Sequence, residues 1–145
     1  MLLNGVYIVT TTWEGKRSGL AVAWATQVEK HHLLLSIGKD SFTCEQILSS
    51  RVFALSQLHD AQSDLARTFG LRSSADSDKF SGIDTEEWGT GAPILKDRFQ
   101  AFECSVVSTQ ELEGQVLITG RVLRNEPPRA DVEPLAYITA DYYED

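Results

Sequence analysis

The chain has 145 residues, of which 42% are hydrophobic and 9% aromatic, and its formal net charge at pH 7 is -8. A chain of this length and composition is expected to fold as one globular domain, residues 1–145, and composition argues against an intrinsically disordered chain. The acidic charge also excludes broad electrostatic binding of nucleic acid, because such binding depends on basic patches.

The sequence predicts neither a membrane segment nor a metal site. Residues 1–5 lack the basic and apolar regions of a signal peptide, and no apolar run reaches the length of a membrane span, so we expect a cytoplasmic protein without membrane contact. Cys44 and Cys104 are far apart and have no histidine pair beside them. This spacing predicts free thiols instead of a disulfide or a zinc site.

Strand patterns dominate the beginning of the chain. Residues 6–12 are rich in β-branched side chains, and Glu14-Gly15-Lys16 marks a turn into a second extended segment over residues 18–28. Together they predict a β-hairpin. The apolar run over residues 33–37 predicts a third strand, which ends at Gly38.

A lysine and several hydroxyl groups follow that strand. Thr43, with Gln46 three residues later, is typical of an N-cap and its capping-box partner at the start of a helix. The first amides of a helix lack intrahelical acceptors and lie at the positive end of its dipole, so they can bind a phosphate. Lys39, Ser41 and Thr43 offer further donors there. The same pattern also suits an ordinary capped helix, and both interpretations stay open.

The rest of the chain adds one short helix and several strands. A strand is predicted over residues 52–58, a helix over 65–69 with Gly70 as its left-handed C-terminal residue, and a long loop over 72–91. Three further strands are predicted over residues 99–107, 115–123 and 135–138. Many short strands and only two short helices favour a closed antiparallel barrel, because closure removes exposed sheet edges.

The order of short sequence blocks resembles the flavin reductase-like family, which includes flavoredoxins and small flavin reductase components. The blocks begin at Gly5 (GVYIVTT), Gly19 (GLAVAWATQV), Ser41 (SFTCEQI), Leu65 (LARTF), Asp78 (DKFSGI), Gly91 (GAPIL), Phe102 (FECSV), Ile118 (ITGRV) and Pro134 (PLAY). The resemblance covers nearly the whole chain. It implies a mainly β fold, the FMN-binding split barrel, which is an antiparallel Greek-key barrel with two or three short flanking helices.

The resemblance also implies FMN, or FAD in its place, as the cofactor. The residues that it places at the flavin are Ala23, Trp24 and Ala25 beside the isoalloxazine, Lys39, Ser41 and Thr43 at the phosphate, and Lys79 and Phe80 closing over the cofactor from the long loop. From its own pattern, Trp24 is equally consistent with a core position. A local field at one helix terminus explains how an acidic protein can hold an acidic cofactor.

Three positions depart from the family pattern. Lys30-His31-His32 replaces a common Asp-Pro-Pro, and Cys44 replaces a common histidine. Its place in the first helical turn would favour a thiolate, but a small structural residue is the preferred interpretation. Glu113-Gly114-Gln115 stands where NAD(P)H-using members often have Gly-Asp-His, whose histidine helps to seat the nicotinamide. Gln115 is therefore the candidate substrate-binding residue, because its side-chain amide can bond a carboxamide.

The predicted function is that of a flavin reductase, an oxidoreductase that transfers electrons from NAD(P)H through FMN to a free flavin or a protein acceptor. The chemistry takes place on the flavin, so no catalytic side chain and no metal are expected. Two alternatives stay open. One is a flavoredoxin-like electron-transfer protein with tightly bound FMN, a redox protein partner and no nicotinamide site; the other is a flavin-binding module without turnover.

The resemblance further implies a homodimer, in which the neighbouring subunit closes the cofactor cleft. Phe80, Ile83 and Trp88 are apolar side chains in an otherwise polar loop. They are therefore the candidates for the subunit contact.

Overall fold

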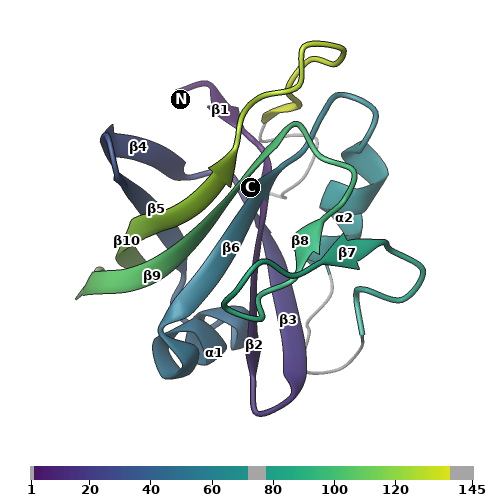
Figure 1. Ribbon diagram of the computed structural model, residues 1–145. Helices are drawn as coiled ribbons and strands as arrows, with labels where there is room; N and C mark the ends of the chain where they lie inside the picture. The colour runs from purple at the N-terminus through teal and green to yellow at the C-terminus, as the bar shows by residue number, and fades with distance from the viewer. Residues whose placement is uncertain (1, 72–77, 138–145) are drawn as a thin grey trace.

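A computed structural model describes residues 2–71 and 78–137 of the chain (Figure 1). Its elements in chain order are β1 (Asn4–Gly5), β2 (Tyr7–Trp13), β3 (Lys16–Val22), β4 (Ala25–Glu29), β5 (His32–Gly38), α1 (Phe42–Ser50), β6 (Val52–Gln57), α2 (Ser63–Leu71), β7 (Thr85–Glu86), β8 (Ile94–Leu95), β9 (Gln100–Glu111), β10 (Gln115–Glu126) and β11 (Ala136–Tyr137).

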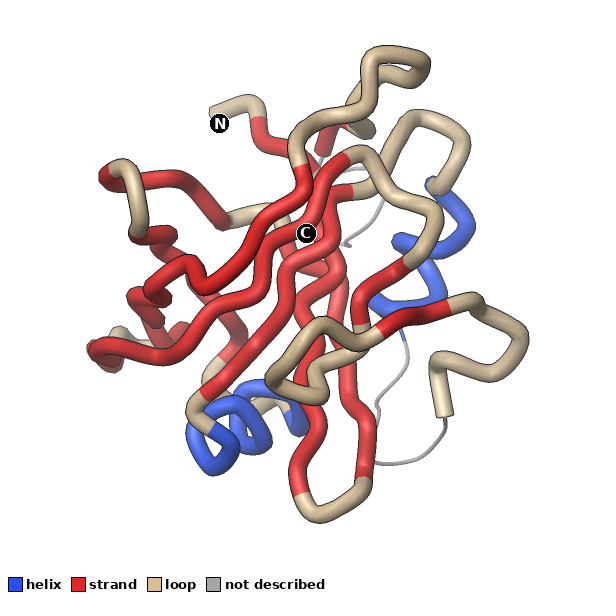
Figure 2. The backbone as a smooth tube through the Cα atoms, viewed as in Figure 1, coloured by secondary structure: helices blue, strands red, loops and turns tan. Residues whose placement is uncertain are grey.

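Seven antiparallel strands form one curved sheet in the order β3-β2-β6-β9-β10-β5-β4. Figure 2 shows these strands curling around a shared interior, with one helix at the lower end and the other at the side. The two edge strands, β3 and β4, follow each other in the chain but do not pair, so the barrel is split between them. The mainly β split barrel with short helices is confirmed.

The predicted hairpin turn is confirmed, but its second strand is shorter than expected. Glu14 and Gly15 both have positive φ, 51° and 77°, between the paired residues Trp13 and Lys16. Two such residues match the right-handed twist of the flanking strands. The extended segment 18–28 is not one strand, because β3 ends at Val22 and β4 begins at Ala25 on the opposite sheet edge.

The start of α1 also differs from the sequence expectation. Its N-cap is Ser41, in an extended conformation (φ -75°, ψ 144°), and its hydroxyl accepts a hydrogen bond from the Cys44 N–H at 3.1 Å. Thr43 instead lies in the first helical turn with its side chain buried. The prediction of a capping box formed by Thr43 and Gln46 is therefore wrong. Ser41 and Thr43 are both residue types that cap helices well. Because the Thr43 side chain is buried, Ser41 is the one that caps α1.

Several smaller differences concern the second half of the chain. Gly70 lies within α2, not after it, and its φ is not in the left-handed region. The long loop contains β7, and the short strands β1 and β8 were not expected. The last predicted strand corresponds to β11. Residues 72–77 of the predicted loop and residue 138 of that strand lie outside the described residues.

The barrel interior is a single hydrophobic cluster to which α1 contributes. Cys44 and Ile47 of α1 are fully buried and pack with apolar side chains of the strands, so α1 closes one end of the barrel. A second cluster lies between α2 and β2–β3. It includes Phe69 and Phe80, whose rings meet edge to face with centroids 5.1 Å apart. Such aromatic pairs add to the stabilisation from burial.

We expect Gly120→Ala to destabilise the barrel. A methyl group at Gly120 would lie 2.6 Å from Cζ of buried Phe53, and overpacking of this kind costs about 1 to 3 kcal/mol. Gly114→Ala is the matched control, because its methyl group would meet no atom within 4 Å. Urea denaturation should give a lower free energy of unfolding for Gly120→Ala only. Equal values for both variants would contradict the close packing.

Candidate functional site

The crossing from β3 to β4 places a short exposed segment beside the end of β5. Ala23 is buried, whereas the Trp24 side chain is 49% exposed. The Trp24 carbonyl accepts a hydrogen bond from the Ser36 N–H at 2.8 Å, which holds the crossing against β5. Ala25 begins β4, which pairs with β5 on one side only. The other edge of β4 therefore presents backbone donors and acceptors to a ligand.

The N-terminus of α1 follows directly after β5. The backbone N–H groups of Phe42 and Thr43 make no hydrogen bond among the described residues, as expected for the first amides of a helix. A methyl group added at Gly38 or Gly114 would meet no atom within 4 Å, so the space at these two glycines, which precede and face the start of α1, is open. Two free amides at the positive end of a helix dipole form a donor set that fits a phosphate group.

The Ser41 hydroxyl makes two hydrogen bonds within the protein at this terminus. It donates a hydrogen bond to the Gly38 carbonyl at 2.8 Å and accepts the one from Cys44. Its single proton is therefore already used. In this conformation Ser41 orients the free amides of α1 and does not itself offer a donor to an anion.

Lys39 is one cation near this terminus, and Lys16 is another, because its Nζ lies over the ring of Phe42 at 4.9 Å from the centroid. The Lys39 backbone N–H donates to the Gly114 carbonyl at 3.0 Å, which ties the end of β5 to the β9–β10 turn. Its Nζ lies 3.2 Å from Oε2 of Glu111, and both side chains remain solvent-accessible, at 41% and 68% exposure. The predicted phosphate residues Lys39, Ser41 and Thr43 thus share one corner of the molecule, together with an acidic side chain that was not expected there.

Gln115 lies near the same corner, as the first residue of β10 and the cross-strand partner of Gly38. Its Oε1 accepts a hydrogen bond from the Ser36 hydroxyl at 3.0 Å. Its amide NH2 group makes no hydrogen bond among the described residues. Ser36 therefore connects two candidate residues, because its N–H bonds Trp24 and its hydroxyl bonds Gln115.

Lys79 and Phe80, which the resemblance places over the cofactor, have buried side chains that contact other parts of the chain. Lys79 is only 3% exposed, and its Nζ donates to the carbonyls of Gly19 and Phe69 at 3.0 and 2.9 Å. Phe80 is 2% exposed and packs against Phe69. Both side chains thus join the loop to β3 and α2, and neither is available to a ligand at the N-terminus of α1.

The residues suggested for a subunit contact are also used within the chain. Phe80 is buried, and Ile83 is partly buried against the same cluster. Trp88 packs on a small cluster below β8, and the guanidinium groups of Arg98 and Arg124 lie over its ring. These three side chains are therefore not an exposed apolar patch, and they are withdrawn as the basis for a dimer contact.

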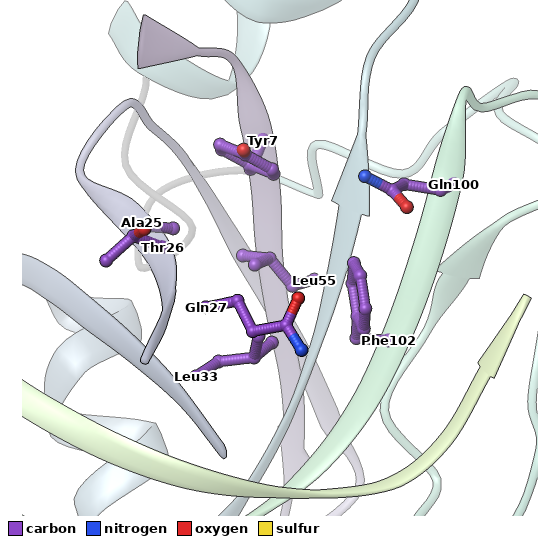
Figure 3. Close-up of a pocket in the computed structure, with 8 residues that line it drawn as sticks. All are labelled: Tyr7, Ala25, Thr26, Gln27, Leu33, Leu55, Gln100 and Phe102. Carbon is purple, nitrogen blue, oxygen red and sulfur yellow. The ribbon is translucent and has the colours of Figure 1, made fainter. Parts of the chain in front are cut away.

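A pocket of about 210 Å³ lies between β4 and β5 on one side and β2, β6 and β9 on the other (Figure 3). Its lining residues are Tyr7, Ala25, Thr26, Gln27, Leu33, Leu55, Gln100 and Phe102. None of them is charged, and burial raises the pKa of Tyr7, so its phenol stays neutral. Of the residues predicted to contact the flavin, Ala25 alone lines this pocket. The sequence offered no signal for it, because its walls come from strands that are far apart in the chain.

Both cysteines are buried free thiols. Burial, and after it the charge of Glu111, raises the pKa of Cys44, which agrees with the preferred small structural residue and not with a thiolate. Burial and the charge of Glu103 raise the pKa of Cys104 to about 12. Each cysteine therefore behaves as a small apolar side chain.

The amino-acid sequence matches the sequence model of the flavin reductase like domain over residues 2–144. The chain belongs to the flavin reductase like family. Among its relatives, the "Probable flavin reductase" of Rhizobium meliloti (strain 1021) is 30% identical over 143 residues, which are 97% of this chain and 44% of that protein. The FMN reductase (NADH) RutF 2 of Methylorubrum extorquens (strain PA1) is 30% identical over 113 residues, 77% of this chain and 65% of that protein.

Solved structures agree with this membership. The crystal structure of a nitrilotriacetate monooxygenase component B homologue from Mycobacterium thermoresistibile superimposes with a TM-score of 0.85 at 26% identity. The match covers 94% of this flavin reductase like chain and 76% of that chain. The chain spans less than half of the length of the Rhizobium relative, so the match concerns this domain and not that whole protein.

The described residues provide neither a membrane-spanning helix nor a metal-binding group of side chains. No helix in residues 2–71 or 78–137 has the length and apolar character needed to cross a bilayer. Within the same residues, no group of histidine, cysteine and acidic side chains is close enough to bind a metal ion. Sequence reasoning missed Ser36 and Glu111 as neighbours of the site, because cross-strand register, not a local motif, brings them there.

We expect neither thiol of the folded protein to react with an aromatic disulfide reagent at pH 8, and both to react in denaturant. Cys44 and Cys104 are buried and protonated when folded, whereas unfolded cysteine titrates at about 8.5. Because the unfolded chain loses these protons first, stability should fall as the pH rises from about 8.5 towards 12. Rapid labelling of the folded protein would contradict the buried, neutral thiols.

Proposed function

We propose that this protein is an FMN-binding oxidoreductase of the flavin reductase type, which passes electrons from NAD(P)H through FMN to a free flavin or a protein acceptor. FAD is the alternative flavin. The observation that carries the proposal is the meeting of the open edge of β4 with the uncovered amides of α1. Such an arrangement suits a ligand with a planar polar ring at one end and a phosphate at the other.

The dimensions of the site support this arrangement. Ala25 pairs with Leu35, which precedes Gly38 by three residues, or about 10 Å along β5. The flavin ring would lie against Trp24 and Ala25 and bond the free backbone edge of β4. The ribityl chain would then follow β5 towards α1, where the amides of Phe42 and Thr43 would hold the phosphate together with Lys39.

The side chains of this site supply position and access. When bound, the flavin supplies the redox chemistry, by accepting and donating a hydride or single electrons. Ser41 fixes the first turn of α1 through its two hydrogen bonds, and Ser36 fixes the Trp24 carbonyl and the Gln115 amide. The free NH2 group of Gln115 can donate to the carboxamide oxygen of a nicotinamide. No protein acid or base is needed for hydride transfer.

An electron-transfer protein without a nicotinamide site is the second candidate. The observation that favours it is Gln115 itself, which occupies the position of the nicotinamide-seating histidine and already bonds Ser36. In this alternative, bound flavin exchanges electrons with a protein partner. The matched proteins include both an FMN reductase (NADH) and a homologue of nitrilotriacetate monooxygenase component B, and neither name identifies the electron acceptor.

A homodimer remains part of the proposal, on a different surface from the one first expected. Val107, Leu112 and Leu123 on the long β9–β10 hairpin are exposed apolar side chains. Exposed apolar groups of this kind often mark a subunit contact. Light scattering of the flavin-bound protein measures the oligomeric state directly.

We expect FMN to bind more tightly than riboflavin, which lacks the phosphate. Lys39→Gln should raise the FMN dissociation constant about threefold to tenfold and leave the riboflavin dissociation constant unchanged, because only the phosphate interacts with the ammonium group. Lys30→Gln, in the turn between β4 and β5, is the matched control. Quenching of flavin fluorescence measures both dissociation constants. Equal affinity for FMN and riboflavin in the parent protein would overturn the phosphate placement.

Anaerobic stopped flow separates the two candidate functions. Under the reductase proposal, NADH or NADPH should bleach the 450 nm band of bound flavin rapidly and saturably, and Gln115→Ala should raise the half-saturating nucleotide concentration more than it lowers the limiting rate. Dithionite reduction should be equal in both proteins, because the flavin itself is unchanged. Bleaching by dithionite but by neither nucleotide would favour the electron-transfer candidate.

A further inference from the structure

Glu111 stands at the end of β9, beside the proposed phosphate position. Its cross-strand partner is Val116, whose side chain is buried in the barrel. Directly opposed residues in an antiparallel pair face the same side of the sheet, so the Glu111 side chain leaves the end of β9 on the same face as Val116. There its Oε2 lies 3.2 Å from Lys39 Nζ.

A second observation places the same carboxylate near the start of α1. Its charge, after burial, contributes to the raised pKa of Cys44, which lies in the first helical turn. A negative charge near the N-terminus of a helix is favourable. The Glu111 carboxylate therefore lies near the same positive groups that would attract a bound phosphate.

This arrangement weakens the binding of a phosphate in two ways. It must share or take Lys39 from Glu111, and it must lie near a like charge. Both side chains are well exposed, so water screens the interaction and its effect is moderate. Binding is therefore weakened but not prevented.

We propose that Glu111 is a built-in competitor for the flavin phosphate, which lowers the affinity for FMN and so favours exchange of the flavin over permanent retention. This inference rests on the proposed function, since it concerns the same phosphate position. It makes Glu111 a residue that sets flavin affinity without touching the ring. The pair Lys39–Glu111 exchanges for Lys39–phosphate when FMN binds.

The dissociation constants of FMN and riboflavin, measured for Glu111→Gln and for the parent protein, test the inference. FMN should bind about threefold to tenfold more tightly than to the parent protein and dissociate more slowly, while riboflavin affinity stays the same. Glu113→Gln removes one negative charge from the same hairpin without a contact to Lys39 and serves as the matched control. The advantage of Glu111→Gln should shrink at high salt. In a Lys39→Gln background the gain should also be smaller, because the competition for the ammonium group is gone.

The outcomes separate this inference from the proposed function. A parent protein that binds FMN more tightly than riboflavin, with an FMN dissociation constant unchanged in Glu111→Gln, would overturn the competitor role alone. An equal gain in Glu113→Gln would also overturn it, because a general reduction of negative charge would then explain the effect. If the parent binds FMN no better than riboflavin, the phosphate site and the competitor role fail together.

Discussion

The crossing of the chain from β3 to β4 is the constraint on which the rest of the structure depends. Two consecutive strands lie at opposite edges of one sheet, so the barrel cannot close by their pairing. The hydrogen bond between the Ser36 N–H and the Trp24 carbonyl fixes where the crossing lies. An open strand edge is usually a liability, because it can pair with other chains. Here the open edge is also the surface on which a planar polar ring can bond the backbone.

The electrostatics of the site are local and oppose the charge of the whole chain. With a formal net charge of -8, the protein as a whole repels an anion. The free amides of Phe42 and Thr43 and the ammonium group of Lys39 act over short distances, where they outweigh the distant charges. The β9–β10 hairpin adjusts this balance, because its turn holds the Lys39 backbone and its end delivers Glu111.

Local sequence signals predicted those parts of the fold that local interactions decide. The Glu14–Gly15 turn and the apolar run before Gly38 were recognised, because turn conformation and alternation are properties of short segments. The change of sheet edge after Val22 was not, because β character continues on both sides and only the strand partners change. The choice of Ser41 over Thr43 as N-cap likewise depends on burial against the barrel, which a short segment does not encode.

The sequence named the segments of the candidate site, but it did not show the directions in which their side chains point. Lys79 illustrates the difference: a loop lysine is ordinarily solvated, but here two backbone carbonyls replace water around its ammonium group. Glu111 shows the reverse, because a hairpin-end glutamate acquires importance only through its register with Val116 and its contact with Lys39. Register between distant strands therefore sets the charge at the proposed phosphate position. Under the proposed role of Glu111, relatives that share the motif around Ser41 would differ in flavin affinity through a residue outside that motif.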